Sequence, residues 1–180
     1  MTNQYVFTSE RLGFRNWSLD DLDEFSELNA DPAVMEHFPA ALTREETTEF
    51  IHRLIAHYDK HGYNYFATEI IGTGELIGFI GLAYQTYEAP FCPATDIGWR
   101  LKKSAWAKGY ATEGARRCLK YAFEELKLDR VISTCTLSNV NSEKVMKKIG
   151  MTRVGEFKHP RLEAFPDYEN CVWYEVSNSS

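Results

Sequence analysis

A strand, a glycine-containing turn and a helix follow one another near the middle of this chain, and no other feature constrains the fold as strongly. The strand is expected over Thr95–Leu101, after a loop that contains two prolines. The turn and the start of the helix have the sequence Trp106-Ala-Lys-Gly-Tyr-Ala-Thr-Glu113. Apolar residues then recur at helical spacing along one face, at Ala111, Ala115, Cys118, Leu119, Ala122, Phe123 and Leu126.

A second block with a similar order lies downstream. Val131–Thr136 is β-branched and apolar enough for a buried strand. The sequence Asn139-Val-Asn-Ser142 follows, and a short helix is expected over Ser142–Ile149 with Ser142 as its cap. Gly150 stands where left-handed backbone commonly ends a helix.

The rest of the chain supplies further strands and two helices. Ser18-Leu-Asp-Asp21 and Thr43-Arg-Glu-Glu46 are typical helix starts, in which a hydroxyl cap is followed by an acid three residues later. Further strands are expected over Phe7–Arg15, Tyr63–Ile71, Glu75–Tyr84, Arg153–Phe157 and Cys171–Val176. This order predicts an α+β fold with a mixed, mostly antiparallel sheet flanked by helices. Since no linker divides the sequence, we expect a single domain over residues 1–180.

Composition narrows the class of protein. A chain of 180 residues that is 44% hydrophobic suits one core, and no apolar run is long enough to cross a membrane. The first residues show no basic region leading into an apolar stretch, so we expect a cytoplasmic protein with free thiols at its four scattered cysteines. The net charge of −6 argues against a general nucleic-acid binder.

The charges are unevenly distributed. Seven bases and one acid, Glu113, lie between Arg100 and Lys120. This basic island indicates a polyanionic ligand, although a solvated helix face explains the charges equally well. The motifs GxxxxGK[ST] and GxGxxG are both absent from the sequence.

Taken together, the two blocks resemble the core of the GNAT acyl-CoA-dependent N-acetyltransferases, a fold with the same order of elements. Within that superfamily, Trp106-Ala-Lys-Gly-Tyr-Ala-Thr-Glu113 is most similar to the RimJ/RimL group, whose members acetylate protein N-termini or small amines. The resemblance implies acetyl-CoA as co-substrate, a primary amine as acceptor, and no role for a metal, a nucleic acid or a membrane. Relatives of this group often pair, so the resemblance also allows a homodimer.

The turn before the long helix is the expected site of the CoA pyrophosphate. The first turn of a helix has unpaired N–H groups and the positive end of the helix dipole, and both favour an anion. Gly109 lets the backbone approach phosphate closely, whereas Ala107 stands where the RimJ/RimL group often has glycine. The resemblance assigns the contacts to Ala107, Lys108, Gly109, Tyr110, Ala111 and Thr112, with Lys102, Lys108 or Arg116 facing the ribose phosphate.

The strand before the turn is expected to run beside the pantetheine arm. An unpaired strand edge presents N–H and C=O groups that an extended amide chain can pair with. The resemblance assigns this role to Trp99, Arg100 and Leu101, with one N–H aimed at the thioester oxygen. Gly98 is expected to permit a bulge that separates this strand from the next. The resemblance further assigns Asn139 to the cofactor arm, and Asn141 and Lys148 to its nucleotide end.

Two residues are candidates for proton transfer. Since an aliphatic amine is mostly protonated at neutral pH, the reaction needs a base. Asp96 stands where many RimJ/RimL relatives carry Glu, and the alternative is an exposed strand carboxylate. Many GNAT enzymes carry a tyrosine acid at the position of Met146, which cannot donate a proton. Ser142 is the nearest hydroxyl, with Ser138, Cys135 and water as alternatives.

The histidines and the competing functions complete the sequence-based expectations. His57 and His61 can share a helix face, but no third ligand of suitable spacing supports a metal site. His159 is expected either to border the acceptor pocket or to lie in a plain turn. Two alternatives to an acetyltransferase remain: a non-catalytic acyl-CoA sensor or interaction module, and a general nucleotide- or phosphate-binding protein.

Overall fold

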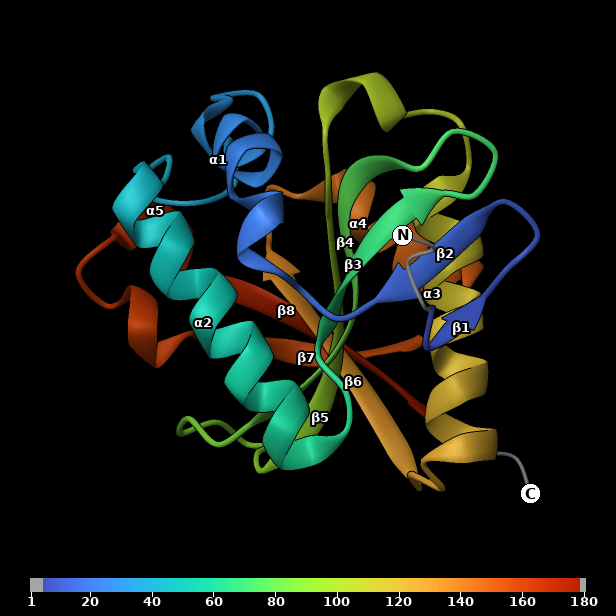
Figure 1. The fold of residues 1–180 in the computed structure, drawn as a ribbon. Coiled ribbons are helices and arrows are strands. Elements are labelled where there is room, and N and C mark those ends of the chain that lie inside the picture. Colours follow the sequence, from blue (N-terminus) through green and yellow to red (C-terminus); the bar gives the residue numbers. More distant parts are fainter. Residues whose placement is uncertain (1–4, 179–180) are drawn as a thin grey trace.

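The structure, a computed structural model, describes residues 5–178 and is built on one eight-stranded sheet (Figure 1). The strands are β1 (Phe7–Thr8), β2 (Leu12–Arg15), β3 (Tyr65–Ile70), β4 (Glu75–Gln85), β5 (Ala94–Leu101), β6 (Arg130–Thr136), β7 (Thr152–Lys158) and β8 (Asn170–Ser177). Their order in the sheet is β1-β2-β3-β4-β5-β6-β8-β7. Every neighbouring pair is antiparallel except β5 and β6, which are parallel. The predicted α+β class with a mixed, mostly antiparallel sheet is confirmed.

Helices cover both faces of the sheet. They are α1 (Leu22–Ala30), α2 (Arg44–His61), α3 (Tyr110–Lys120), α4 (Val140–Lys148) and the short α5 (Pro166–Glu169). In Figure 1, α1 and α2 lie on one side of the sheet and α3 on the other. The largest core cluster joins the sheet to α3 and α4, and a second joins it to α1 and α2.

Local sequence signals place the helix starts correctly. Ser18 caps a 3-10 turn that leads into α1, and Thr43 caps α2; both form the expected reciprocal capping box. The prediction of one strand over 7–15 is wrong, because β1 and β2 are separated by a tight turn. The Ser9 hydroxyl accepts the Leu12 N–H at 3.2 Å within that turn, while the Ser9 N–H bonds the Leu12 carbonyl.

The two faces of strand β5 carry different side chains: apolar ones face α3, and Asp96 and Arg100 face α1 and α2. Successive side chains of a strand point to opposite faces, so the odd-numbered residues of β5 lie on one face of the sheet and the even-numbered residues on the other. Ile97 and Leu101 pack into the core cluster with α3. Arg100 reaches the other way, to Asn29 on α1. Asp96, Gly98 and Arg100 therefore share the face covered by α1 and α2.

The sheet is interrupted between its two parallel strands. β5 and β6 share a single registered pair, Asp96 with Ile132, so the edge of β5 beyond Asp96 has no neighbouring strand. The separation of these strands is as predicted, but the bulge expected at Gly98 is wrong. The register between β4 and β5 runs unbroken from Gly78 opposite Leu101 to the other end of β5. The separation therefore lies on the β6 side, not in a distortion of the β4–β5 ladder.

Glycines in β4 and β5 instead make room for a neighbouring tyrosine. A Cβ on Gly98 would lie 3.2 Å from Cε1 of Tyr65, and a Cβ on Gly81 would lie 2.2 Å from the carbonyl oxygen of Asn64, the residue before β3. Gly81 and Gly98 are directly opposite each other. Together they let β3 approach closely and let the Tyr65 ring lie across the sheet toward β5.

We expect Gly81→Ala to destabilise the protein by about 2–3 kcal/mol, because the added methyl group meets β3 backbone that cannot move alone. Urea unfolding measures this free energy. Gly72→Ala is the matched control, because a Cβ on Gly72 meets nothing within 4 Å; its effect should stay below about 0.5 kcal/mol. Equal stability of the two variants would contradict the proposed close approach of β3 and β4.

Candidate active site

The turn before α3 has the backbone geometry of an anion site. Gly109 is the N-cap of α3 and has a left-handed φ of 81°. The first bond of the helix joins the Glu113 N–H to the Gly109 carbonyl at 3.0 Å, so the N–H groups of Tyr110, Ala111 and Thr112 lack partners within the helix. Ala107 also has a positive φ, of 58°, a conformation that glycine adopts with less strain.

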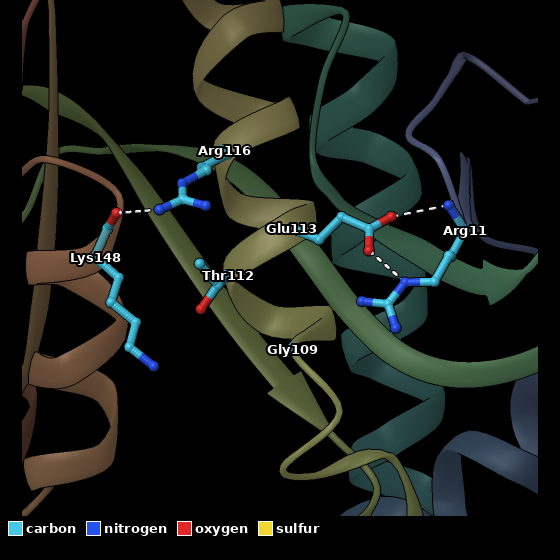
Figure 2. A pocket seen from close by; sticks show the side chains of 6 residues that line it. All are labelled: Arg11, Gly109, Thr112, Glu113, Arg116 and Lys148. Atoms are coloured by element: carbon cyan, nitrogen blue, oxygen red, sulfur yellow. Dashed lines mark hydrogen bonds and ion pairs between the residues drawn. The ribbon is translucent and has the colours of Figure 1, made fainter.

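An open, positively charged cleft of about 510 Å³ lies at this end of α3 (Figure 2). Its lining residues are Arg11, Gly109, Thr112, Glu113, Arg116 and Lys148. Three predicted cofactor residues, Gly109, Thr112 and Lys148, are therefore brought together from α3 and α4. A hydrogen bond from Arg116 Nη2 to the Lys148 carbonyl at 2.7 Å joins α3 to α4 at the edge of the cleft.

Arg11 belongs to the cleft although the sequence analysis missed it. It comes from the turn between β1 and β2, and its guanidinium lies 4.5 Å from the centre of the Tyr110 ring. Its Nε pairs with the Glu113 carboxylate at 2.7 Å, and its Nη1 donates to the Lys108 carbonyl at 3.1 Å. No local signal identifies this role, because it depends on a contact between segments far apart in the chain.

The one acid in the basic island is neutralised by these contacts. Burial acts to raise the pKa of Glu113, but hydrogen bonds from the Ser9 hydroxyl and from Arg11 outweigh it and hold the pKa below its ordinary value. In Figure 2 the Glu113 side chain points to Arg11, on the other side of the helix from Lys148. Lys102, predicted as one option for the ribose phosphate, instead pairs with Glu75.

Backbone hydrogen bonds define which residues of β5 face the gap. The Lys102 N–H bonds the Ile77 carbonyl of β4 at 2.9 Å. Since backbone groups alternate in direction along a strand, even-numbered residues of β5 bond to β4 and odd-numbered ones face β6. Trp99 and Leu101 therefore direct their backbone groups toward the open edge, whereas the backbone of Arg100 is directed to β4.

Two carbonyls on the open edge already have partners. The buried Ser133 hydroxyl donates to the Ile97 carbonyl at 2.8 Å and bridges β6 to β5 just beyond their last pair. The Trp106 indole N–H donates to the Leu101 carbonyl at 2.8 Å. The backbone groups left over are the N–H and C=O of Trp99 and the N–H of Leu101, which form a short row suited to an amide chain.

On the far side of the gap, Asn139 rather than Ser142 caps α4. The Asn139 Oδ1 accepts the Ser142 N–H at 3.1 Å, and the helix begins at Val140, before the predicted start. The predicted cap at Ser142 is therefore wrong, because the asparagine side chain reaches the third N–H of the helix. Within residues 5–178 the Ser142 hydroxyl has no hydrogen-bond partner. Met146 is buried, and Asn141 is exposed.

Asp96 lies at the closed end of the gap, and only 8% of its surface is exposed. The Tyr65 hydroxyl donates to its Oδ1 at 2.6 Å, and the Gln85 amide donates to its Oδ2 at 3.2 Å. Burial raises the pKa of Asp96 to about 7, against the opposing effect of these hydrogen bonds. Burial also raises the pKa of Tyr65 well above its ordinary value, so its proton stays in place. The alternative of an exposed strand carboxylate is excluded.

Residues from the C-terminal part of the chain approach the same carboxyl group. The His159 ring lies 4.5 Å from that of Tyr87, and the Arg161 guanidinium lies 5.3 Å from the Tyr87 ring. The Asp96 carboxylate contributes to the raised pKa of Tyr87, whereas the Arg161 charge acts to lower the pKa of Asp96. His159 is the N-cap of a 3-10 turn, and burial lowers its pKa. The expected turn at His159 is present, and its place at the border of the acceptor pocket stays a prediction.

His57 is occupied by structural hydrogen bonds. Its Nδ1 lies 2.7 Å from the Tyr63 carbonyl, and its Nε2 accepts the Tyr84 N–H at 2.9 Å. Residues 5–178 contain no group of three or more His, Cys, Asp or Glu side chains arranged to hold a metal ion. Over the same residues, none of the helices has the length and apolar character required to traverse a bilayer.

We expect Tyr65→Phe to shift the rising limb of the activity–pH profile upward by about one pH unit. The Tyr65 hydrogen bond favours the ionised carboxylate, so its loss raises the pKa of Asp96 further and delays ionisation to higher pH. The measurement is kcat/KM for amine acetylation between pH 5.5 and 9.

Tyr63→Phe is the matched control for this profile. The Tyr63 hydroxyl bonds Thr95 at 2.9 Å, and its ring belongs to the core cluster that includes α3. Its profile should remain that of the unaltered protein. An unchanged profile for Tyr65→Phe would mean that Asp96 does not control the limb.

We expect Gly109→Val to weaken CoA binding by about tenfold or more, because a branched side chain disfavours the left-handed N-cap and misaligns the N–H groups. Calorimetric titration with CoA measures the affinity. Gly74→Val is the control, because Gly74 has a similar φ of 70° but lies in the β3–β4 turn. Loss of affinity in both variants would indicate general destabilisation.

Comparison with known proteins points to one family. The family model described as "Acetyltransferase (GNAT) domain" matches residues 11–152. The uncharacterized N-acetyltransferase YnaD of Bacillus subtilis is 32% identical over 152 residues, which cover 84% of this chain and 85% of that protein. The crystal structure of a GNAT-family acetyltransferase from Bacillus anthracis is 31% identical, with a TM-score of 0.77 and coverage of 96% and 98%. The ribosomal L7/L12 alpha-N-protein acetyltransferase RimL, solved with coenzyme A, shares the fold at 19% identity, with a TM-score of 0.77 and coverage of 97% and 98%.

Proposed function

This chain belongs to the GNAT acetyltransferase family and is an acetyl-CoA-dependent N-acetyltransferase, and from that premise we propose that a primary amine attacks the thioester directly, with Asp96 as the base. The acceptor is the N-terminus of a peptide or protein, or a small-molecule amine. One observation carries the proposal: a buried carboxyl group with a pKa of about 7 lies where the pairing of β5 and β6 ends.

The cleft at the start of α3 is the proposed site of the CoA pyrophosphate. Unpaired N–H groups and a left-handed glycine fit phosphate oxygens, and Lys148 with Arg11 and Arg116 supplies the positive charge. Backbone N–H groups from Ala107 to Thr112 are the proposed contacts. The Asn139 amide nitrogen, left free by the cap, and the exposed Asn141 are proposed to contact the arm and the nucleotide end.

The proposed reaction balances without a metal or a redox step. The amine nitrogen attacks the thioester carbon after Asp96 takes one of its protons, directly or through a water molecule. The C–N bond forms and the C–S bond breaks, so that CoA leaves as a thiolate. The nitrogen loses its second proton as the amide forms, and that proton passes through water or the Ser142 hydroxyl to the thiolate sulfur. The Trp99 N–H on the open edge of β5 is the proposed donor to the oxygen of the tetrahedral intermediate.

Protonation of the leaving thiolate does not require a strong general acid from the protein. A thiol of this type has a pKa of about 8.5, so water suffices to protonate it near neutral pH. The Ser142 hydroxyl, half-buried in the first turn of α4 and without a hydrogen bond to residues 5–178, is the proposed donor. It acts in place of the tyrosine that Met146 replaces.

The cysteines support direct attack rather than a covalent acyl-enzyme. Burial raises the pKa of Cys135 to about 12 and that of Cys171 to about 11, and it raises the pKa of Cys118 well above its ordinary range. A thiol that stays protonated is a poor nucleophile. The RimJ/RimL group is the proposed place of this chain within the family, because its turn sequence has that wording and its fold matches RimL.

We expect Asp96→Asn to lower kcat near pH 7.5 by about 10²–10⁴-fold while the affinity for acetyl-CoA stays within about twofold. Thiol release from acetyl-CoA, assayed with a panel of peptides, polyamines and amino acids, measures the rate. Asp59→Asn, on the exposed face of α2, is the control and should retain full activity.

The same panel separates the competing functions. Tight CoA binding without turnover on any amine would favour an acyl-CoA sensor. Stronger stabilisation by ATP than by CoA in a thermal-shift titration would favour a general nucleotide-binding protein. Full activity of the Asp96 variant at every pH would remove that residue from its proposed role.

A further inference from the structure

Arg100 carries a partly buried charge for which the described residues offer no acidic partner. Its guanidinium lies on the Asp96 face of β5, between the sheet and the segment that joins α1 to α2. Within residues 5–178 no carboxylate forms an ion pair with it. Burial lowers the pKa of Arg100 to about 10, which reflects the missing counter-charge. An unpaired buried charge is costly, so such a group indicates a function that requires it.

The hydrogen bonds of Arg100 leave one edge of the guanidinium free. Nη1 donates to the Asn29 Oδ1 at 2.8 Å, and Asn29 is itself buried and bonded to Thr47. Nε is buried without any partner. The Nε–Nη2 edge is the side of a guanidinium that binds a carboxylate with two parallel hydrogen bonds.

Aromatic rings surround the same guanidinium. Ring centres of Phe38, Phe79 and Phe50 lie 4.4, 5.3 and 5.7 Å from its central carbon. Rings interact with the flat face of a guanidinium, so they leave its hydrogen-bonding edge available. Phe38 is 39% exposed and belongs to neither flanking helix. The Phe38 ring therefore lies on the solvent side of the guanidinium.

A continuous set of side chains joins this cation to the proposed base. Phe79 stacks on Tyr65 with ring centres 5.0 Å apart, and the Tyr65 hydroxyl bonds Asp96. Tyr65 also lies near enough to Arg100 to act on its pKa, which it raises against the effect of burial. Gly98, between Asp96 and Arg100 on this face, has no side chain to separate them. The acceptor side of the sheet therefore has a base at one end and a cation at the other.

We propose that Arg100 binds a carboxylate of the acceptor, and that the preferred acceptor is a peptide N-terminus with an acidic side chain at its second or third residue. This inference rests on the proposed function, because it takes Asp96 as the site of the reacting amine. Arg100 lies four residues along β5 from Asp96, which is about 13 Å between Cα atoms.

The spacing excludes a free α-amino acid as the preferred acceptor. Its amine and carboxylate share one carbon atom, so they cannot reach both ends of the site together. An extended peptide advances about 3.3–3.6 Å per residue, so the Cα atoms of its second and third residues lie about 3.5 and 7 Å from that of the first, and an acidic side chain extends this reach. Together with the reach of the Arg100 side chain, this distance matches the site.

The test compares pentapeptides that differ in one side chain. Ser-Ala-Glu-Ala-Ala, its Gln and Lys counterparts, and the diamine putrescine are assayed as acceptors with the unaltered enzyme. We expect kcat/KM for the Glu peptide to exceed that for the Gln peptide by about tenfold or more, mainly through KM. The Lys peptide should be poorer still.

Variants of Arg100 test the residue itself. Arg100→Gln should remove the preference for Glu over Gln by raising KM for the Glu peptide, so that the ratio of the two kcat/KM values falls toward one. Arg100→Lys, which keeps the charge but not the two-bond geometry, should keep part of the preference. Lys103→Gln, an exposed neighbouring cation, is the control and should keep all of it.

The outcomes distinguish this inference from the proposed function. Acetylation of all peptides without a preference for Glu, or of putrescine alone, would overturn the role of Arg100 and leave the acetyltransferase intact. A preference that persists in Arg100→Gln would also overturn it, as would Arg100-dependent use of succinyl-CoA over acetyl-CoA. Absence of turnover with every acceptor would overturn both. If an Arg100 variant fails to fold, the peptide series on the unaltered enzyme still tests whether the enzyme prefers an acidic acceptor.

Discussion

The early end of pairing between β5 and β6 is the constraint on which the site depends. If the two parallel strands stayed paired beyond Asp96 and Ile132, their backbone groups would satisfy each other and no edge would remain. The gap is limited at its start by the Ser133 hydroxyl, which takes the Ile97 carbonyl. The backbone groups of Trp99 and Leu101 are thus left unpaired beside a packed apolar core.

The gap separates two electrostatic environments. On the α3 side, helix N–H groups and cations from three segments line an open cleft. Charges there stay in contact with water, so their desolvation free energy is small. On the α1 and α2 side, Asp96 and Arg100 are desolvated, and their pKa values move toward the neutral forms. Burial moves the pKa of Asp96 toward neutral pH, so the function that we propose divides polyanion binding and proton transfer between the two faces.

The positions of glycine explain how Asp96 is buried and still held. Gly81 and Gly98 lie opposite each other; backbone at the start of β3 fills the space beside Gly81, and the Tyr65 ring fills the space beside Gly98. The Tyr65 hydroxyl donates to Oδ1 of Asp96, which leaves Oδ2 to accept a hydrogen bond from the Gln85 amide. These hydrogen bonds stabilise the ionised form of Asp96, but burial has the larger effect and keeps its pKa raised.

Local sequence patterns determined the elements and the turn. The capping signals at Ser18 and Thr43, the apolar stripe of α3 and the Gly109 turn each depend on residues a few positions apart, and each was predicted from the chain alone. The predictions that were wrong, a continuous strand over 7–15, a bulge at Gly98 and a cap at Ser142, concern choices between similar local energies. Only tertiary structure brought Arg11 to Glu113, Tyr65 to Asp96 and the Phe38 ring over Arg100. Those contacts, and the desolvation that sets the two pKa values, depend on segments distant in sequence, and no periodicity or motif encodes how such segments pack.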